Sequence, residues 1–288
     1  MPAVREETVF TVEKNVKKGE LFTRMLSVIE AAGWEDISSL PSKDFYIMHS
    51  KGEDGKQDLY FQLHHTYSGY HIETTNYSMI QLKPLTKYEP GEIGVAGIQT
   101  PSTQSQVFAS VCTYDRSPKH TFDMYYIANK DRLMFVIEDT YAKESNFFYI
   151  GKPNPTYNKA YKNQGLVFCM SNNRYLTSTF MMGEADSTNV TSHTINLVSR
   201  GMDSSFDAGG NLLLNELVFT STGGGFIGYM DGVYHVHQDA QFMEKGRPGD
   251  IVILNYKKYR LFRMVYPVTG SSWISLYNTV RYMLIRID

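Results

Sequence analysis

The chain has 288 residues, and its 28 Lys and Arg residues nearly balance 30 Asp and Glu residues, which leaves a formal net charge of −2. This balance excludes a polyelectrolyte that binds nucleic acid or acidic lipid through its overall charge. A compact chain of this size buries roughly 75% of its unfolded surface, so it needs no disulfide or metal to fold. The two cysteines, Cys112 and Cys169, lie in strand-like runs, which favours free buried thiols over a disulfide or a reactive thiol.

Apolar residues are spread along the chain rather than gathered into long runs. No run of about 18 apolar residues occurs, and the first residues have no apolar core of signal-peptide length. We therefore expect no membrane span and folding in a cytoplasm. Aromatic residues make up 14% of the chain, which suits either extensive buried interfaces or a sugar-binding surface.

The N-terminal region predicts an arm followed by a helix. Residues 1–18 read as an arm with a short strand at Thr8–Val12, frayed or ordered only against a partner. Gly19–Ala32 predicts a helix, because its apolar residues recur at spacings of three and four. Gly33 is placed to end this helix, and Trp34 then reads as a core anchor rather than a ligand platform.

The stretch Asp44–Leu63 predicts a β-hairpin. Phe45, Ile47 and His49 alternate with their neighbours at the two-residue period of a strand. The Gly- and Asp-rich residues 52–55 supply the turn, and alternation resumes at Leu59. The preceding helix should pack on this hairpin's sheet, since an amphipathic helix of its length is not stable alone.

Further strands complete the N-terminal half. Asn129-Lys130-Asp131 is a good hairpin turn between two of them. The Pro- and Gly-rich segment Lys83–Ser105 predicts a long loop or an element that reaches a neighbouring molecule. The strands are expected at His64–Tyr67, Tyr70–Thr75, Tyr77–Leu82, Phe108–Tyr114, Tyr125–Ile127, Leu133–Glu138 and Phe147–Ile150.

The Pro- and Asn-rich stretch Lys152–Tyr161 is the predicted domain boundary. We expect an α+β domain over residues 1–155 and a mainly β domain over residues 156–288. Glu184–Gly210 is rich in Ser, Thr and Asn and predicts an extended polar excursion rather than core, with only Ile195–Val198 strand-like. The C-terminal strands are expected at Leu166–Met170, Arg174–Met182, Leu212–Thr220, Phe226–Met230, Val233–His237, Asp250–Asn255, Tyr259–Tyr266 and Thr279–Ile287.

Short strands with tight turns favour an antiparallel sandwich or barrel for the C-terminal half. Asp231-Gly232 is the strongest short hairpin signal in the chain. The predicted fold class is therefore α+β and mainly β, with an N-terminal helix packed on an antiparallel sheet, followed by an antiparallel β-sandwich or barrel.

The candidate metal site is weak. His235 and His237 share one face of a predicted strand, Asp239 continues the row, and Glu244 with Pro248–Asp250 suggests a cupin-like arrangement. The spacing from His237 to Glu244 is too long for that arrangement and no third histidine follows, so an exposed polar strand face is the favoured interpretation.

Other motifs do not predict a catalytic site. His64 and His65 are adjacent and point to opposite faces of a strand, and Gly223–Gly225 lacks the Lys-Ser/Thr of a phosphate loop. We therefore predict no catalytic residue, no cofactor, no metal and no enzyme activity. Between Lys245 and Asp288 there are eight basic residues and two acidic ones, which suggests either a surface for an acidic partner or DNA or, preferably, solvated strand faces.

The order of these features resembles structural proteins of tailed bacteriophage virions. The resemblance is carried by the segments AAGWEDI, SKGEDGKQDLYFQL, NKDRLMFVIE, FFYIG, GFIGYMDGVYHV, GDIVILNYKKYRLFRMVY and YMLIRID. It implies a neck or tail component of a contractile-type particle, built as a ring of identical subunits, with six-fold symmetry expected. It implies a virion location, other neck or tail proteins as partners and no active residues, while the balanced charge leads us to expect no direct nucleic-acid binding.

Two hypotheses of other classes stay open beside this one. A baseplate, receptor- or glycan-binding β module is favoured by the aromatic content. A cupin-like metal enzyme would use His235 and His237. Rings, glycan binding without rings, or stoichiometric bound metal would distinguish the three.

Overall fold

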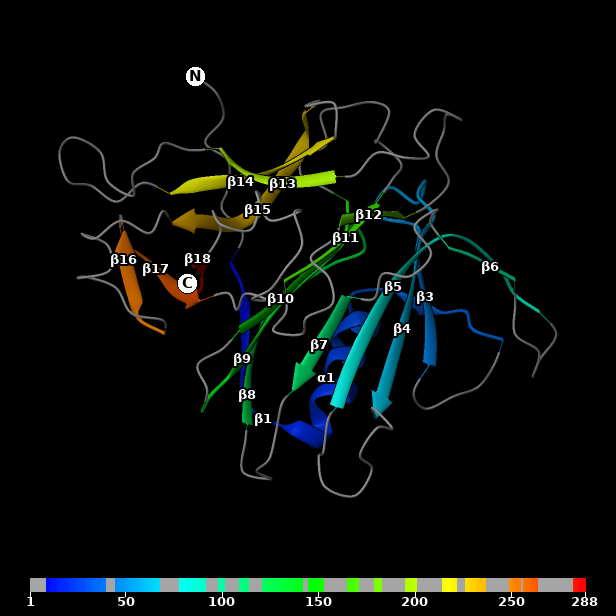
Figure 1. Ribbon diagram of the computed structural model, residues 1–288, viewed down its shortest axis with the longest axis horizontal. Helices are drawn as coiled ribbons and strands as arrows, with labels where there is room; N and C mark the ends of the chain where they lie inside the picture. Colours follow the sequence, from blue (N-terminus) through cyan, green and yellow to red (C-terminus); the bar gives the residue numbers. More distant parts are fainter. Residues whose placement is uncertain are drawn as a thin grey trace, which may run out of the picture.

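The computed structural model describes fifteen segments of the chain, and every structural statement below refers to them. They are residues 9–39, 45–67, 78–91, 98–101, 109–113, 121–141, 145–152, 165–170, 179–182, 195–200, 214–221, 226–236, 249–254, 256–263 and 282–288. They contain three antiparallel sheets and one helix (Figure 1).

Sheet A is the middle layer, and its strands come from both halves of the chain. Its order is β1 (Thr11–Lys17), β8 (Thr121–Ala128), β9 (Arg132–Asp139), β10 (Ser145–Gly151), β11 (Gly165–Met170) and β12 (Thr179–Met182).

Sheets B and C lie on either side of sheet A. Sheet B has the order β2 (Glu35–Asp36), β3 (Phe45–Ser50), β4 (Leu59–Tyr67), β5 (Ser78–Glu89) and β6 (Ile98–Pro101), and β7 (Ala109–Thr113) also pairs with β5. Sheet C has the order β13 (Ile195–Arg200), β14 (Asn215–Ser221), β15 (Phe226–Val236), β18 (Tyr282–Arg286), β17 (Lys257–Arg263) and β16 (Ile251–Leu254).

Strand β9 shows why sheet A is central. Its side chains alternate between two hydrophobic cores, with Leu133, Phe135 and Ile137 in the core shared with sheet B and Met134 and Val136 in the core shared with sheet C. A strand buried on both faces is apolar without alternation, as LMFVI is here. The predicted mainly β fold with an N-terminal helix and antiparallel sheets is confirmed.

Helix α1 (Lys18–Ala31) packs through one face into the core between sheets A and B. Met25 and Ile29 are fully buried, and the helix is followed by Gly33 at φ 87°, the left-handed conformation expected of a terminating glycine. Trp34 packs edge-on against Phe61 at a ring distance of 5.2 Å. Its indole N–H donates to the Asn129 carbonyl at 2.9 Å, so the prediction of a core anchor is confirmed.

The predicted hairpin turn at Asn129-Lys130-Asp131 joins separate parts of the fold. Asn129 and Arg132 close the turn through reciprocal backbone hydrogen bonds. The turn of the predicted 44–63 hairpin lies against it, because Ser50 Oγ donates to the Lys130 carbonyl at 2.6 Å and the Glu53 N–H donates to the Asp131 carboxylate at 2.9 Å. Both predicted hairpins are confirmed, and these hydrogen bonds join their two turns.

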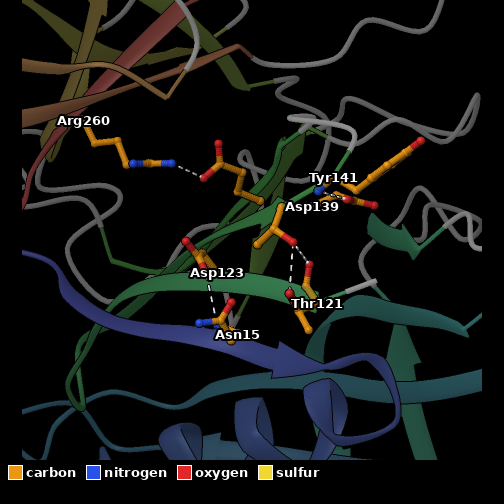
Figure 2. A network of polar contacts seen from close by, with 8 residues as sticks. Asn15, Thr121, Asp123, Asp139, Tyr141 and Arg260 are labelled. Atoms are coloured by element: carbon orange, nitrogen blue, oxygen red, sulfur yellow. Dashed lines mark hydrogen bonds and ion pairs between the residues drawn. The ribbon is translucent and has the colours of Figure 1, made fainter. Parts of the chain in front are cut away.

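Two ion pairs connect opposite ends of β9 to sheet C. Arg132 Nη2 lies 3.3 Å from an Asp231 carboxylate oxygen, and both side chains are buried. Glu138 is paired with Arg260 at 2.5 Å, and the Glu138 side chain is 2% exposed. Figure 2 shows the Arg260 side chain extended toward this contact. The Arg260 guanidinium also lies 5.4 Å from the centre of the Tyr125 ring, and burial raises the pKa of the Tyr125 hydroxyl. The hydroxyl therefore stays neutral beside these charges.

The prediction of a hairpin at Asp231-Gly232 is wrong. Residues Phe226–Val236 form one continuous strand, β15. Its pairing with β14 skips three residues, because Glu216 of β14 lies opposite Tyr234 and the next residue, Leu217, lies opposite Met230. Asp231, Gly232 and Val233 therefore form a bulge. Gly232 has φ 84°, as a turn glycine would, but Asp231 is held by Arg132, so the chain bends without reversing.

The prediction of a long loop at Lys83–Ser105 is wrong for its described residues, and the alternative of an element that reaches a neighbouring molecule stays a prediction. Strand β5 continues to Glu89, and Ile98–Pro101 forms β6. Pro84 is tolerated inside a strand because β5 pairs with β7 up to Leu82 and with β6 from Leu85 onward. Among the described residues, the ladder on this side of β5 therefore has a gap at Pro84, and such a gap tolerates a residue without an N–H.

The N-terminal arm and the polar excursion each contain an ordered strand. Residues 11–17 form β1, an edge strand paired with β8, and the Phe10 N–H donates to the Arg286 carbonyl of β18 at 2.8 Å. Within the predicted excursion, Ile195–Arg200 pairs with β14 as strand β13. The rest of Glu184–Gly210 and residues 1–8 lie outside the described residues.

The predicted boundary at Lys152–Tyr161 falls between two neighbouring strands of one sheet. Strand β10 pairs with β11 from Phe147 to Gly151, so sheet A continues across residue 155. Sheet C is formed entirely by later residues, and a division after β12 separates the sheets more cleanly. The C-terminal half contributes one described sheet of its own, so the predicted sandwich or barrel in that half stays a prediction.

Substitution of Glu138 by Gln tests the buried connection between sheets A and C. The change keeps the side-chain size but leaves the Arg260 charge largely buried without its counter-charge, so we expect a loss of about 3–5 kcal/mol in the free energy of unfolding. Urea denaturation followed by fluorescence measures it.

Asp288→Asn is the matched control. It weakens the Lys258–Asp288 pair, which is 3.2 Å long and has both side chains exposed to solvent, so we expect a much smaller loss of stability than for Glu138→Gln. Equal losses in the two variants would contradict a special role for the Glu138–Arg260 pair.

Candidate interaction surface at the edge of sheet C

The β16–β17 hairpin presents apolar side chains to solvent. Ile251 is 45% exposed, Ile253 is 65% exposed and Tyr256 is fully exposed. Ile251 and Ile253 share one face of β16, since successive side chains of a strand alternate between faces. Tyr256 follows in the turn, so the three lie on one short hairpin.

The opposite face of this hairpin holds it in place. Val252 and Leu254 pack on a small hydrophobic cluster formed by Tyr234, Tyr259, Leu261 and Leu284. Strand β16 pairs with β17 along its length, from Ile251 opposite Arg260 to Leu254 opposite Lys257. The exposed isoleucines therefore belong to a packed strand and not to a loose loop.

Tyr256 has an unfavourable backbone conformation for its residue type. Leu254 and Lys257 are paired across the hairpin, and Tyr256 lies in the turn between the two strands. Tyr256 has φ 64°, a conformation that costs a residue with a β-carbon about 1–2 kcal/mol. A fully exposed ring offsets none of this cost within the subunit, and such strain is a feature of binding sites.

The charges around this hairpin are partly used within the subunit. Lys258 pairs with Asp288, Arg286 donates to the Asp288 carbonyl at 2.5 Å, and Arg260 is engaged with Glu138. Three of the basic residues that the sequence gathers after Lys245 thus have acceptors on this chain.

Among the residues that the structure describes, Tyr141 is also strongly exposed, at 79%. It follows β9 at the far end of sheet A, where its N–H donates to the Asp139 carboxylate at 2.8 Å (Figure 2). In the same network the Asn15 N–H donates to Asp123 at 3.0 Å, where the β1–β8 register shifts. These contacts shape the ends of strands and bring together no apolar surface.

The structure describes the side chains of His64 and His65 but only the backbone of His235 among the predicted histidine sites. His64 and His65 point to opposite faces, as predicted, because His65 stacks on Phe22 at 4.6 Å and His64 meets Phe45 edge-on at 5.9 Å. The backbone of His235 lies in β15 opposite Asn215 and Met283. His237, Asp239 and Glu244 lie outside the described residues, so the prediction of no metal site there stays a prediction.

Other candidate residues fall partly or wholly outside the description. Cys112 and Cys169 have backbone positions in β7 and β11, opposite Met79 and Phe148, and their side chains are not described. Gly223–Gly225 lies outside the described residues. Within the described segments, no three His, Cys, Asp or Glu side chains are grouped so as to hold a metal ion.

No protein-family model and no curated protein sequence matches this chain. Among the residues that the structure describes, no helix has the length and apolar character needed to cross a membrane. The sequence analysis predicted a strand at Asp250–Asn255 but did not single out its exposed side chains. The available signal was a strand without charges followed by Asn-Tyr, where a two-residue turn usually has Gly.

Replacement of Tyr256 by Gly tests the strain at the turn. Glycine adopts positive φ without steric cost, so we expect the free energy of unfolding of the isolated subunit to rise by about 0.5–1 kcal/mol. Thermal unfolding of the dilute protein measures it. Tyr141→Gly is the control for losing an exposed aromatic side chain and is expected to bring no such gain; an equal gain there, or a loss at 256, would contradict the strain.

Proposed function

We propose that this protein is a structural subunit of a bacteriophage virion that forms a ring in the neck or tail, as a head–tail connector, collar or tail-completion protein. The observation that carries the proposal is the exposed apolar β16–β17 hairpin, which projects from a tightly connected β core. A subunit of an assembly needs both features, because its core must fold alone while its contact surfaces are completed by neighbours.

The core supports this role through its connections. Sheet A is buried on both faces, and the Arg132–Asp231 and Glu138–Arg260 pairs join it to sheet C. Such a subunit presents its surface hairpin in a fixed orientation. A repeated heterologous contact closes a ring only if each copy holds the same angle.

The resemblance of the sequence to tailed-phage structural proteins supplies the virion and the neck or tail as the setting. Assembly in the host cytoplasm, six-fold symmetry and contacts with other neck or tail proteins are parts of the same proposal. The balanced charge gives the subunit no general attraction for DNA, so protein–protein contacts are the expected mode of assembly.

A second candidate function is receptor or glycan binding by a baseplate module. The observation in its favour is the full exposure of the Tyr256 ring, together with the strongly exposed Tyr141. Exposed aromatic faces are suited to stacking, but these two rings lie on different strand ends and share no groove in the described part. A cupin-like metal enzyme has only the predicted His235 and His237 pair in its favour.

Electron microscopy distinguishes these functions. We expect cyclic rings in concentrated purified protein, or one ring of this subunit in reconstructed particles of the phage. Finding the protein as a lone peripheral copy in the particle would contradict the ring. Glycan-array binding without rings, lost in Tyr256→Ala, would favour the receptor-binding function, and a stoichiometric metal ion would favour the enzyme.

A further inference from the structure

We propose that the interior between sheets A and C contains a binding site for ordered water, which joins the hydroxyls of Tyr125 and Ser145 to the Arg260 guanidinium. The site lies beside the Glu138–Arg260 pair. The inference concerns the interior of the subunit and goes beyond the proposed virion role, on which it does not depend.

Three buried polar atoms carry the inference. The hydroxyl oxygens of Tyr125 and Ser145 and the Nε of Arg260 are shielded from solvent and have no hydrogen-bond partner among the residues that the structure describes. Tyr125 and Ser145 are each 1% exposed. Buried polar groups are nearly always bonded to the protein or to ordered water, because an unsatisfied one costs its full desolvation energy. We therefore expect these atoms to have a partner outside the chain.

The strand register gathers the two hydroxyls on one face of sheet A. Ser145 of β10 lies directly opposite Glu138 of β9. Tyr125 of β8 lies opposite Val136, two residues before Glu138 on the same face. Directly opposite residues of antiparallel strands project to the same side, and Tyr125 and Val136 belong to the core shared with sheet C. Ser145 therefore projects toward sheet C beside Glu138.

Arg260 reaches the same place from sheet C. Its guanidinium lies 5.4 Å from the centre of the Tyr125 ring, and its Nη2 pairs with Glu138. The raised pKa of the Tyr125 hydroxyl is due first to burial, and the charges of Arg260, Glu138 and Asp123 also act on it. The hydroxyl is therefore close to the charged pair, whose Nε–H is left to donate elsewhere.

The chemistry of these groups selects water over an ion. The carboxylates of Glu138 and Asp123 disfavour an anion beside Arg260, and the Arg260 charge disfavours a cation. Arg260 Nε–H can only donate, whereas each hydroxyl can donate and accept. One water molecule can accept from Nε and from one hydroxyl and donate to the other, which gives it the two to four polar partners that buried water requires.

The backbone near the pair leaves room for a further atom. A Cβ at Gly249 would lie 3.6 Å from Arg260 Nη2 and 3.8 Å from Glu138 Oε1, which are ordinary contact distances. An atom can therefore be placed beside both charged groups without displacing either. Ordered water needs such space in addition to polar partners.

Crystallography of the full chain, at a resolution that shows ordered water, tests the site directly. We expect a water molecule within hydrogen-bonding distance of at least two of the three atoms. Water on fewer than two of them, including direct bonds from the hydroxyls to protein groups in its place, would overturn the proposal.

Urea denaturation of Tyr125→Phe and Ser145→Ala gives an independent measurement. Each change removes a hydroxyl that is bonded to water, so we expect the folding equilibrium constant to fall roughly five-fold. Removal of a hydroxyl without a partner would instead raise it, because the desolvation cost disappears. Ser27→Ala is the control: its exposed hydroxyl contacts the Thr23 carbonyl within helix α1, and we expect no loss because Ala favours a helix.

The double variant shows whether the two hydroxyls share one partner. Strand β9 separates β8 from β10, so the two backbones lie roughly 10 Å apart, and effects at such a distance normally combine independently. Shared water couples them, so we expect the loss in the double variant to be clearly smaller than the product of the two single losses. Independent losses, or a gain in stability in either single variant, would overturn the proposal.

Discussion

The burial of strand β9 on both faces is the constraint on which the rest of the structure depends. Its apolar run from Leu133 to Ile137 can be satisfied only by one layer on each side, which sheets B and C supply. Its charged ends cannot be buried alone, since an uncompensated buried charge costs several kcal/mol. Asp231 and Arg260 neutralise them, so sheet C is positioned by both apolar packing and charge.

The turn before β9 connects the central strand to the elements of the N-terminal half. Residues 129–131 accept hydrogen bonds from Trp34 after helix α1, from Ser50 and Glu53 around the first hairpin, and from Lys152 after β10. A Cβ at Gly52 would lie within 3 Å of the Gln57 side chain and the Asp131 carboxylate. Helix α1, the first hairpin and the middle sheet therefore meet at one turn, so a substitution in this turn affects the contacts of all three.

The sequence was sufficient where a local pattern and its tertiary environment agreed. Helix α1, the 44–63 hairpin and the 129–131 turn each had a clear period or turn signal. Prediction failed where a distant residue changed the meaning of a local signal. Asp231-Gly232 became a bulge because Arg132, 99 residues earlier, holds its carboxylate, and Pro84 stayed in a strand because two partners meet beside it. The exposed hairpin was missed because exposure depends on which strand ends a sheet, and no local pattern contains that order.

The stable core and the exposed edge are connected through Arg260. This residue lies on β17, opposite Ile251 of the edge strand, and its guanidinium reaches Glu138 of the central strand. Gly249, just before β16, lies where a Cβ would come within 4 Å of both charged side chains. The apolar edge is thus attached through one strand to the most buried part of the molecule. The side chains of Ile251 and Ile253 are therefore held on a strand that the central sheet supports.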